Sequence, residues 1–328
     1  MAAASNFKSA RARSRFRQKL LAWYGVNGRA LPWRETRDPY RIWVSEIMLQ
    51  QTRVAAVLDH YRRFLKQFPS VQALAQAQES AVLAAWSGLG YYRRARMLHA
   101  AAKKVAHEYA GQIPDSAEAL RNLPGIGRYT ANAIASIAFA EPVAVVDGNV
   151  ERVLARMSEV PIAQSELWTT AQNLLDPARP GDFNQAMMEL GATICLPGVP
   201  ECHRCPVKSA CCSRGQKLVA RTPGAQRLRK SASLKLVVRN GKILLRQRPT
   251  SAQLMPCMWE LPEYARGIRR QPQLRLKHSI TSTDWSINVY TCRASASSGE
   301  TWVPLSQLAR LPLTGLTRKI LRRTNLLA

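Results

Sequence analysis

Four cysteines crowd into seventeen residues, and this cluster constrains the fold more than any other feature of the chain. Cys195, Cys202, Cys205 and Cys211 leave six, two and five residues between successive thiols. We expect no secretory signal, because no charged, apolar and small-residue regions follow one another in that order, and clustered thiols then indicate a metal before disulfides. Four thiolates at this spacing can close around a tetrahedral zinc ion or a cubane iron–sulfur cluster, and physical chemistry alone leaves both open.

The charge of the chain is strongly and unevenly positive. Its 328 residues hold 48 Lys and Arg against 21 Asp and Glu, a formal net charge of +27. Residues 1–212 carry +9 of this charge and residues 213–328 carry +18. A small soluble domain needs a net charge of only about 2–8, so we expect a nucleic-acid partner rather than a merely solvated surface. No apolar run approaches the roughly 18 residues of a membrane helix, so no membrane contact is expected.

The hydrophobic pattern predicts an all-α region followed by an α+β domain. Apolar residues recur at three- and four-residue steps, which predicts helices at 16–24, 54–68, 71–85, 92–109 and 116–122. Asp115 and Glu118 resemble a capping box at the start of the last helix, and residues 29–40, with two prolines, are predicted to be a loop. Beyond a basic linker at 213–230, apolar runs at 234–238 and 243–247 flank Asn240-Gly241, which predicts a β-hairpin. Further strands are expected at 285–292 and 301–304.

The first 17 residues are basic, rich in Ser and Ala, and free of acidic residues. This composition suits either an organelle transit peptide or a basic arm. Helical periodicity begins near Phe16, which favours the arm.

Residues 123–130, with the sequence LPGIGRYT, lie between two predicted helices. Gly125 and Gly127, separated by one apolar residue, allow a tight turn with positive φ angles, and the next helix then begins with unpaired backbone N–H groups that suit a phosphate. This pattern predicts a DNA-binding helix-hairpin-helix. An ordinary turn between two helices is the alternative.

Two acidic residues stand in unusual surroundings. Glu46 lies in a nearly apolar helical segment, where burial would raise its pKa and keep its proton available near neutral pH. Asp147 follows an apolar run and precedes Gly148, in the position of a helix N-cap. On pattern alone, a surface acid and an ordinary cap are the favoured interpretations.

Further segments carry a resemblance to a known family. Residues 31–34 (LPWR), 44–52 (VSEIMLQQT), 88–92 (GLGYY), the hairpin and 146–150 (VDGNV), together with the cysteine spacing, resemble the MutY-type adenine DNA glycosylases of the endonuclease III superfamily in order and spacing. The similarity runs from about Phe16 to Cys211 and continues more weakly through the C-terminal domain. It implies a [4Fe–4S] cluster on the four cysteines, whereas Cys212, Cys257 and Cys292 fall outside the spacing and are expected to be inert.

The resemblance implies a domain plan. A helix-hairpin-helix glycosylase region at 1–212 would consist of a six-helix barrel at 31–140 and an iron–sulfur module made of 1–30 plus 141–212. The basic linker at 213–230 would lead to a Nudix-like lesion-recognition domain at 231–328. No acidic Nudix box is present, so pyrophosphate hydrolysis is not expected.

The resemblance also implies residue roles. Glu46 would protonate the adenine and Asp147 would stabilise the positive sugar that remains, with Tyr129 and Asn149 near the reacting sugar. The base would first leave the duplex stack. The residues expected to contact DNA or the flipped base are Arg29, Leu31, Trp33, Arg34, Gln51, Tyr91, Gly125, Gly127, Gln185, His278 and Thr281; the aromatic residues could instead be core, and Gln51 a solvated helix residue.

Position 129 separates activities within this superfamily. A lysine there would form a Schiff base and nick the strand, and Tyr129 cannot do so, which implies a monofunctional enzyme. Tyrosine is also found in thymine glycosylases that act on T·G mismatches, and these are the alternative activity; a catalytically idle DNA-structure binder is another. The Nudix-like domain favours the MutY-type function.

The expected function is therefore base-excision repair, in which the enzyme hydrolyses the N-glycosidic bond of adenine mispaired with 8-oxoguanine or guanine. Related C-terminal domains often carry a His-x-Phe-Ser-His loop that probes 8-oxoguanine, whereas residues 278–282 here read HSITS. His278 and a hydroxyl at Thr281 are kept, but Ile280 and Ser282 differ, and a plain β-hairpin without a ligand is the alternative. The expected partner is mismatched double-stranded DNA, bound by a monomer, in the cytoplasm of a bacterium or in a nucleus or mitochondrion.

Overall fold

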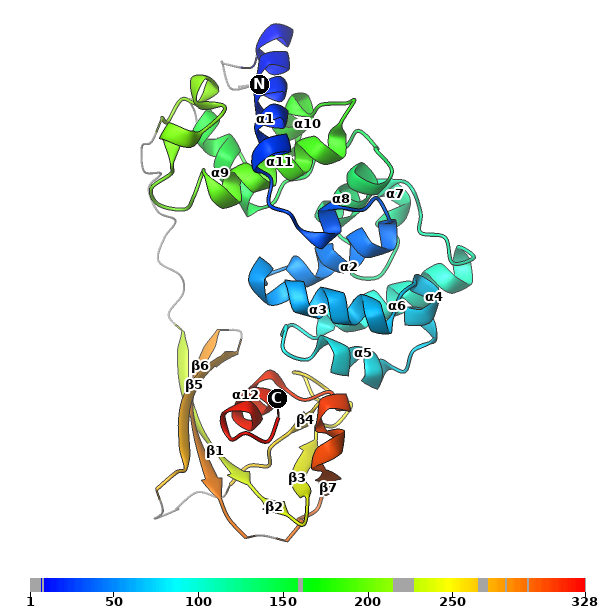
Figure 1. Ribbon diagram of the computed structural model, residues 1–328, viewed down its shortest axis with the longest axis vertical. Coiled ribbons are helices and arrows are strands. Elements are labelled where there is room, and N and C mark those ends of the chain that lie inside the picture. The colour runs from blue at the N-terminus through cyan, green and yellow to red at the C-terminus, as the bar shows by residue number, and fades with distance from the viewer. Residues whose placement is uncertain are drawn as a thin grey trace. The chain divides into compact units, whose positions relative to one another are not determined.

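The computed structural model describes residues 7, 9–158, 162–214, 227–264, 271–280, 282–293 and 295–327. The chain divides into two compact units (Figure 1). The first comprises residues 1–61, 70–72 and 100–223, and the second comprises residues 62–69, 73–99 and 224–328. Most of the predicted linker, residues 215–226, lies outside the described residues, as do residues 1–6 and 8 of the predicted arm. The predicted domain boundaries remain predictions.

The described part of the chain before Cys211 contains helices and no strands, as its hydrophobic pattern predicts. The helices are α1 (Ala10–Asn27), α2 (Pro39–Leu49), α3 (Val54–Gln67), α4 (Val71–Gln76), α5 (Glu79–Trp86), α6 (Arg93–Glu108), α7 (Ala117–Leu120), α8 (Arg128–Ala138), α9 (Gly148–Met157), α10 (Leu167–Leu174) and α11 (Pro180–Thr193). Short 3-10 turns lie at η2 (Pro32–Arg34), η3 (Cys202–Arg204) and η4 (Lys208–Ala210).

Several helix ends differ from the predicted ones for identifiable reasons. The N-terminal helix begins earlier, because the Ser9 side chain accepts a hydrogen bond from the Ala12 amide and caps α1. The predicted capping box at Asp115 is wrong: Ser116 caps α7 by accepting from the Ala119 amide. The predicted loop at 29–40 contains η2 and the start of α2, where Asp38 caps the helix and Pro39 occupies its first turn.

The core of the first unit gathers around α11. This helix packs against α1, α8 and α9, and its buried residues Phe183, Met187 and Leu190 join Phe16 of α1 and Val153 of α9 in one apolar cluster. The helices α1 and α11, which are far apart in sequence, therefore pack against the same core. This packing fixes the start of the segment that follows each helix.

The C-terminal part of the second unit is α+β, as predicted. One sheet has the order β1-β6-β5, from β1 (Leu228–Leu236), β5 (Leu274–Ile280) and β6 (Thr283–Thr291), with β1 and β6 parallel. The other sheet consists of β2 (Val238–Arg239), β3 (Lys242–Gln247), β4 (Trp259–Glu260) and β7 (Glu300–Pro304). The predicted hairpin is confirmed, since Asn240 and Gly241 both take positive φ between β2 and β3.

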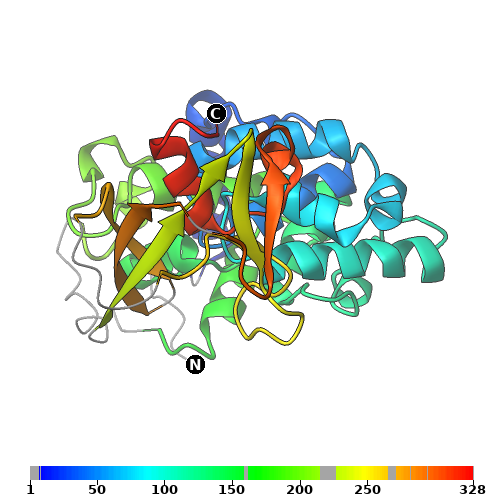
Figure 2. The same cartoon turned by 90° about the horizontal axis from the view of Figure 1, so that it is seen from below.

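Helix α12 (Gly315–Arg323) completes this part of the second unit (Figures 1 and 2). Its buried Ile320 and Leu321 join Leu245, Ile287 and Val289 of the strands in a second apolar core. A further 3-10 turn, η5, lies at Leu305–Arg310. Strand β1 begins at Leu228, inside the predicted linker, and β5 was not predicted. Among the described helices, none is both long and apolar enough to span a membrane.

Candidate active site

A pocket of about 350 Å³ lies within the first unit and brings together residues from distant parts of the sequence. Ten of the residues predicted for catalysis or base binding line it: Arg29, Leu31, Trp33, Arg34, Glu46, Gln51, Tyr129, Asp147, Asn149 and Gln185. Among the described residues, the lining of a larger cavity of about 640 Å³ beside Arg13 and Arg17 includes no acidic side chain. The pocket with the two acids is therefore the one suited to proton transfer.

Helix α2 presents Glu46 to this pocket from an otherwise apolar face. The side chain is buried, and its Oε2 has no hydrogen-bond partner among the described residues. Burial raises the pKa of the Glu46 carboxyl to about 7, and the negative charge of Asp147 contributes in the same direction. The Tyr129 hydroxyl and the positive charge of Arg34 act against this rise in pKa. A carboxyl with this pKa holds a transferable proton near neutral pH.

Asp147 caps α9, as its position in the sequence predicts. Its Oδ1 accepts hydrogen bonds from the amides of Asn149 and Val150 at 2.9 and 2.7 Å. Its Oδ2 accepts from the Asn149 side-chain amide at 2.8 Å. The carboxylate is fixed in orientation by three donors, and it still lines the pocket beside Glu46. Capping and charge stabilisation are thus compatible roles for one side chain.

Asn149 links Asp147 to the loop that carries the cysteines. Its Oδ1 accepts from Arg152 Nη2 at 2.8 Å, and Arg152 Nε donates to the Cys195 carbonyl at 2.8 Å. Helix α11 approaches closely here, because a Cβ at Gly191 would lie 2.6 Å from the Asn149 Cβ. A larger residue at position 191 would therefore displace Asn149.

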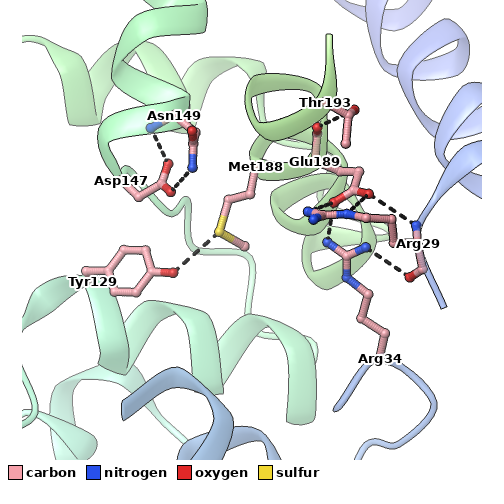
Figure 3. A network of polar contacts seen from close by, with 8 residues as sticks. All are labelled: Arg29, Arg34, Tyr129, Asp147, Asn149, Met188, Glu189 and Thr193. Carbon is pink, nitrogen blue, oxygen red and sulfur yellow. Dashed lines mark hydrogen bonds and ion pairs between the residues drawn. The ribbon is translucent and has the colours of Figure 1, made fainter. Parts of the chain in front are cut away.

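Tyr129 comes from the first turn of α8 and faces both acids. Its hydroxyl lies 3.4 Å from the Met188 sulfur of α11 (Figure 3). Burial raises the pKa of this phenol well above its usual value, and the negative charges of Glu46 and Asp147 add to the effect. Tyr129 is therefore a neutral hydroxyl on which both carboxyl groups act.

Glu189 is a buried acid that the sequence did not single out. Its carboxylate accepts from Arg29 Nε and Nη2, each at 2.7 Å, and from Arg34 Nη2 at 2.8 Å. Figure 3 shows Met188 reaching toward Tyr129 while the neighbouring Glu189 reaches toward the two arginines. The hydrogen bonds from these arginines hold the pKa of Glu189 at about 2 despite its burial.

The remaining pocket residues differ in exposure. Leu31, Trp33 and Gln185 are buried. Gln51 is exposed and has a φ of 55°, which turns the chain sharply after α2. Tyr91, which was also predicted to contact DNA or the flipped base, lies in the second unit; it is 52% exposed, with a φ of 46°.

The predicted hairpin lies between α7 and α8. Gly125 takes a φ of 76°, as predicted for this tight turn, whereas Gly127 is extended and serves as the N-cap of α8. Next to it, the Arg128 guanidinium stacks 4.0 Å from the centre of the Trp168 ring. The positive charge at the start of α8 is therefore held in place by α10.

The four clustered cysteines are half-buried beside the core of the first unit. Burial raises the pKa of the Cys205 thiol to about 11, and the charges of Cys195, Cys211 and Cys202 act on it in the same direction. Arg156, which is itself buried, donates to the Cys195 sulfur at 3.2 Å. Among the described residues, no three His, Cys, Asp or Glu side chains are close enough to be recognised as a site for a single metal ion.

Comparisons with known proteins agree with this geometry. Residues 44–174 match the model of the HhH-GPD superfamily of base excision DNA repair proteins, and residues 234–323 match a NUDIX domain. A solved structure of a thermostable thymine-DNA glycosylase is 30% identical, with a TM-score of 0.58, and the match covers 62% of this chain and 96% of that one.

This chain belongs to the HhH-GPD superfamily.

Curated proteins named adenine DNA glycosylase also resemble part of this HhH-GPD chain. The adenine DNA glycosylase of Rattus norvegicus is 50% identical over 228 residues, which cover 64% of this chain and 44% of the rat protein. That of Buchnera aphidicola subsp. Baizongia pistaciae is 41% identical and covers 60% of this chain and 57% of its own. The matched regions span less than two thirds of either relative. Endonuclease III trapped on DNA is 22% identical, with a TM-score of 0.55, and shares the fold.

The residues predicted for lesion readout and for the hairpin are not among the described residues that line the pocket. His278 is on β5, and burial lowers the pKa of its imidazole, with Lys319 nearby adding to the effect. Thr281 lies outside the described residues, and Ser282 is in the turn that joins β5 to β6. Gly125 and Gly127 belong to the hairpin and do not line the pocket.

Sequence reasoning missed several residues of the HhH-GPD pocket. They are Ile42, Ser45, Leu49, Gln50, Thr52, Val54, Ile137, Met188, Glu189 and Ala192. Glu189 gave one signal that could have revealed it: it stands between Met188 and Leu190 in an apolar helix, where an acid requires a positive partner.

Proposed function

We propose that this chain is a monofunctional adenine DNA glycosylase of base-excision repair. The observation that carries the proposal is the placement of Glu46 and Asp147 in one pocket but in different hydrogen-bonding environments. Burial favours a proton on Glu46, whereas three hydrogen-bond donors stabilise the negative charge of Asp147. Two carboxyl groups held in different environments are what an acid and a charge stabiliser require. The relatives named adenine DNA glycosylase support adenine as the base.

The reaction follows from these two side chains. Glu46 gives its proton to N7 of the flipped adenine, so the bond between N9 and the sugar C1′ breaks with its electron pair leaving on the base. Asp147 stabilises the positive charge that develops on the sugar. Water then attacks C1′ and returns a proton to Glu46, which leaves an abasic site and the enzyme in its starting state. Tyr129 carries no amine, so the sugar is not captured as a Schiff base.

The two carboxyl variants test this assignment directly. Glu46→Gln keeps the size of the side chain but removes the proton, and Asp147→Asn keeps the cap but removes the charge. We expect both to bind a duplex with adenine opposite 8-oxoguanine and to excise adenine at least about 100-fold more slowly than the wild type. If Glu46→Gln excises at near the wild-type rate, Glu46 is not the acid.

We propose that Cys195, Cys202, Cys205 and Cys211 hold a [4Fe–4S] cluster. The four thiols are free, Cys195, Cys211 and Cys202 act electrostatically on Cys205, and Cys195 accepts a hydrogen bond from buried Arg156, which fits a ligand set that is deprotonated on metal binding. When bound, the cluster would supply cross-links that order the loop from 195 to 211. Arg204 and Lys208 on that loop would then be placed to contact phosphate.

We propose that the NUDIX domain contributes lesion readout. His278, on β5, and Thr281 would contact 8-oxoguanine opposite the adenine. Because Ile280 replaces the aromatic residue of the loop and Ser282 its last histidine, the preference for 8-oxoguanine over guanine should be smaller than with a complete loop. The enzyme would act as a monomer wherever the cell keeps its DNA.

A second candidate is a thymine glycosylase acting on T·G mismatches. The match that covers 96% of a thymine-DNA glycosylase, together with Tyr129, favours it. The NUDIX match at 234–323 and the relatives named adenine DNA glycosylase favour the adenine enzyme. Release of thymine from a T·G duplex, with none of adenine, would decide for this candidate.

A further inference from the structure

The two arginines of the pocket wall depend on a single acid. Arg29 lies just after α1, and Arg34 lies in η2. Glu189 lies in α11, and all three residues line the pocket. The Glu189 side chain is 0% exposed and accepts four hydrogen bonds, including one from the Arg29 amide at 3.1 Å. A buried carboxylate that loses this many partners would be strongly destabilised, so the cluster is held as one unit.

Arg34 is restrained from three directions. Its Nη2 binds Glu189, its Nη1 donates to the Arg29 carbonyl at 3.2 Å, and its guanidinium lies 5.4 Å from the centre of the Tyr24 ring. Arg29 Nη1, in contrast, has no hydrogen-bond partner among the described residues. The cluster thus combines a fixed arginine with a second arginine that keeps donors available to a ligand.

The charges of the cluster leave one positive charge beside the acid of the reaction. Two guanidiniums and one carboxylate sum to a single positive charge within the pocket wall. The charged or titratable groups that act on Glu46 from the elements packed around it are Tyr129 on α8, Asp147 before α9 and Arg34 on η2. Of these, Arg34 is the cation, and its charge favours loss of the Glu46 proton.

We propose that Glu189 is a positioning residue: it holds the guanidiniums of Arg29 and Arg34 on the wall of the pocket and offsets part of the positive charge that Arg34 places at Glu46. The inference rests on the proposed function, in which Glu46 must carry a proton. Glu189 acts through the arginines and does not touch the reacting atoms. Without its negative charge, Arg34 would stabilise ionised Glu46 more strongly, and less of the enzyme would hold the proton near neutral pH.

The test is the pH dependence of single-turnover adenine excision, from about pH 5 to about pH 9. In the wild type, the rate should fall as pH rises through the pKa of Glu46. In Glu189→Gln, this fall should occur at lower pH. For a pKa that starts at about 7, a downward displacement by one unit would lower the protonated fraction at pH 7 about fivefold.

Three further variants separate charge from shape. Glu189→Asp keeps the negative charge and should leave the pH of the fall unchanged, although its shorter reach should lower the rate. In Arg34→Gln with Glu189→Gln, the cation that acts on Glu46 is lost together with the acid that offsets it, so the pH at which the rate falls should return to its wild-type value or above it. Asp182→Asn removes a surface acid from the first turn of α11, the helix that carries Glu189. This variant should change neither the excision rate nor the pH at which the rate falls.

The outcomes distinguish the two proposals. If the wild-type protein releases no adenine, the proposed function fails. The titration of Glu46 can then still be followed by the infrared carbonyl band that disappears in Glu46→Gln, and an equal midpoint in wild type and Glu189→Gln would overturn the inference. If adenine is released, the inference fails when Glu189→Gln has the same pH profile as the wild type. It also fails when the double variant does not restore the pH at which the rate falls. In either case the proposed function still stands.

Discussion

The Asn149 side-chain amide donates to Asp147 Oδ2 at 2.8 Å, so the carboxylate that we propose to stabilise the sugar is oriented by a neighbour as well as by the helix that it caps. The same Asn149 accepts from Arg152, whose Nε binds the Cys195 carbonyl. Asp147 is thereby connected through two side chains to the loop of the proposed cluster. A displacement at either end of this connection would reach the carboxylate.

Asn149→Ala should slow excision with little effect on folding. The variant removes one of three donors to Asp147 but keeps the two backbone donors that cap α9. A small misplacement of a catalytic group costs about 100-fold in rate, so we expect single-turnover excision to fall by about that factor while duplex affinity stays near the wild-type value. Equal rates for Asn149→Ala and wild type would show that the backbone donors suffice to orient Asp147.

Glu46 should make the fold less stable as pH rises. Its pKa is 4.5 in the unfolded chain and about 7 when folded, so the stabilising preference of the folded state for the proton is complete below pH 4.5 and is lost as pH rises through 7. The difference corresponds to about 3 kcal/mol. Glu46→Gln should therefore be more stable than the wild type at about pH 8 and should lose this advantage at about pH 4. Urea unfolding at both pH values measures the free energy of unfolding of each protein. A difference between variant and wild type that does not vary with pH would contradict this prediction.

The four clustered cysteines should be required for iron binding, whereas the neighbouring Cys212 should not. The purified protein should be brown, with broad absorption at about 400 nm, and should contain iron. Cys202→Ser should lose both, whereas Cys212→Ser, whose sulfur lies 3.0 Å from the Met157 carbonyl instead, should keep both. Zinc without iron in the wild-type protein would show that the four thiols hold a different metal.

Tyr129 should prevent covalent capture of the sugar. We expect borohydride to trap little or no enzyme on DNA, and strand breaks to appear only after alkali treatment, because no amine is available at this position. A denaturing gel of the trapping reaction, run beside Tyr129→Lys, measures both. Efficient trapping of the wild type would mean that another lysine reaches the sugar.

The sequence predicted those parts of the site that depend on local signals. Asp147 could be placed because an N-cap is recognised from the residues that follow it, and Glu46 stood out because an acid in an apolar helix is costly unless it keeps its proton. Its assignment as the acid came from the family resemblance. Glu189 could not be placed in the pocket, because its partner Arg29 lies 160 residues away and only the packing of α11 brings them together.

In the fold, too, the features that depend on local signals were predicted and those that depend on distant contacts were not. The helical region and the Asn240-Gly241 hairpin were predicted from periodicity and turn chemistry, which are local. Strand β5 was missed although its exposed Arg275 and Lys277 alternate with more buried residues, and its pairing with β6 joins it to the sheet. The parallel pairing of β1 with β6 joins segments about 50 residues apart and left no local signal.

Identification of the base released from matched duplexes tests the central claim most directly. Purified protein is incubated with duplexes that differ at one pair, A·8-oxoguanine, A·G or T·G, and the free base is identified by chromatography. Wild-type protein should release adenine fastest from A·8-oxoguanine, more slowly from A·G, and should release no thymine, while Glu46→Gln should release nothing. Release of thymine from T·G without release of adenine, or binding of all three duplexes without release of any base, would contradict the proposed function.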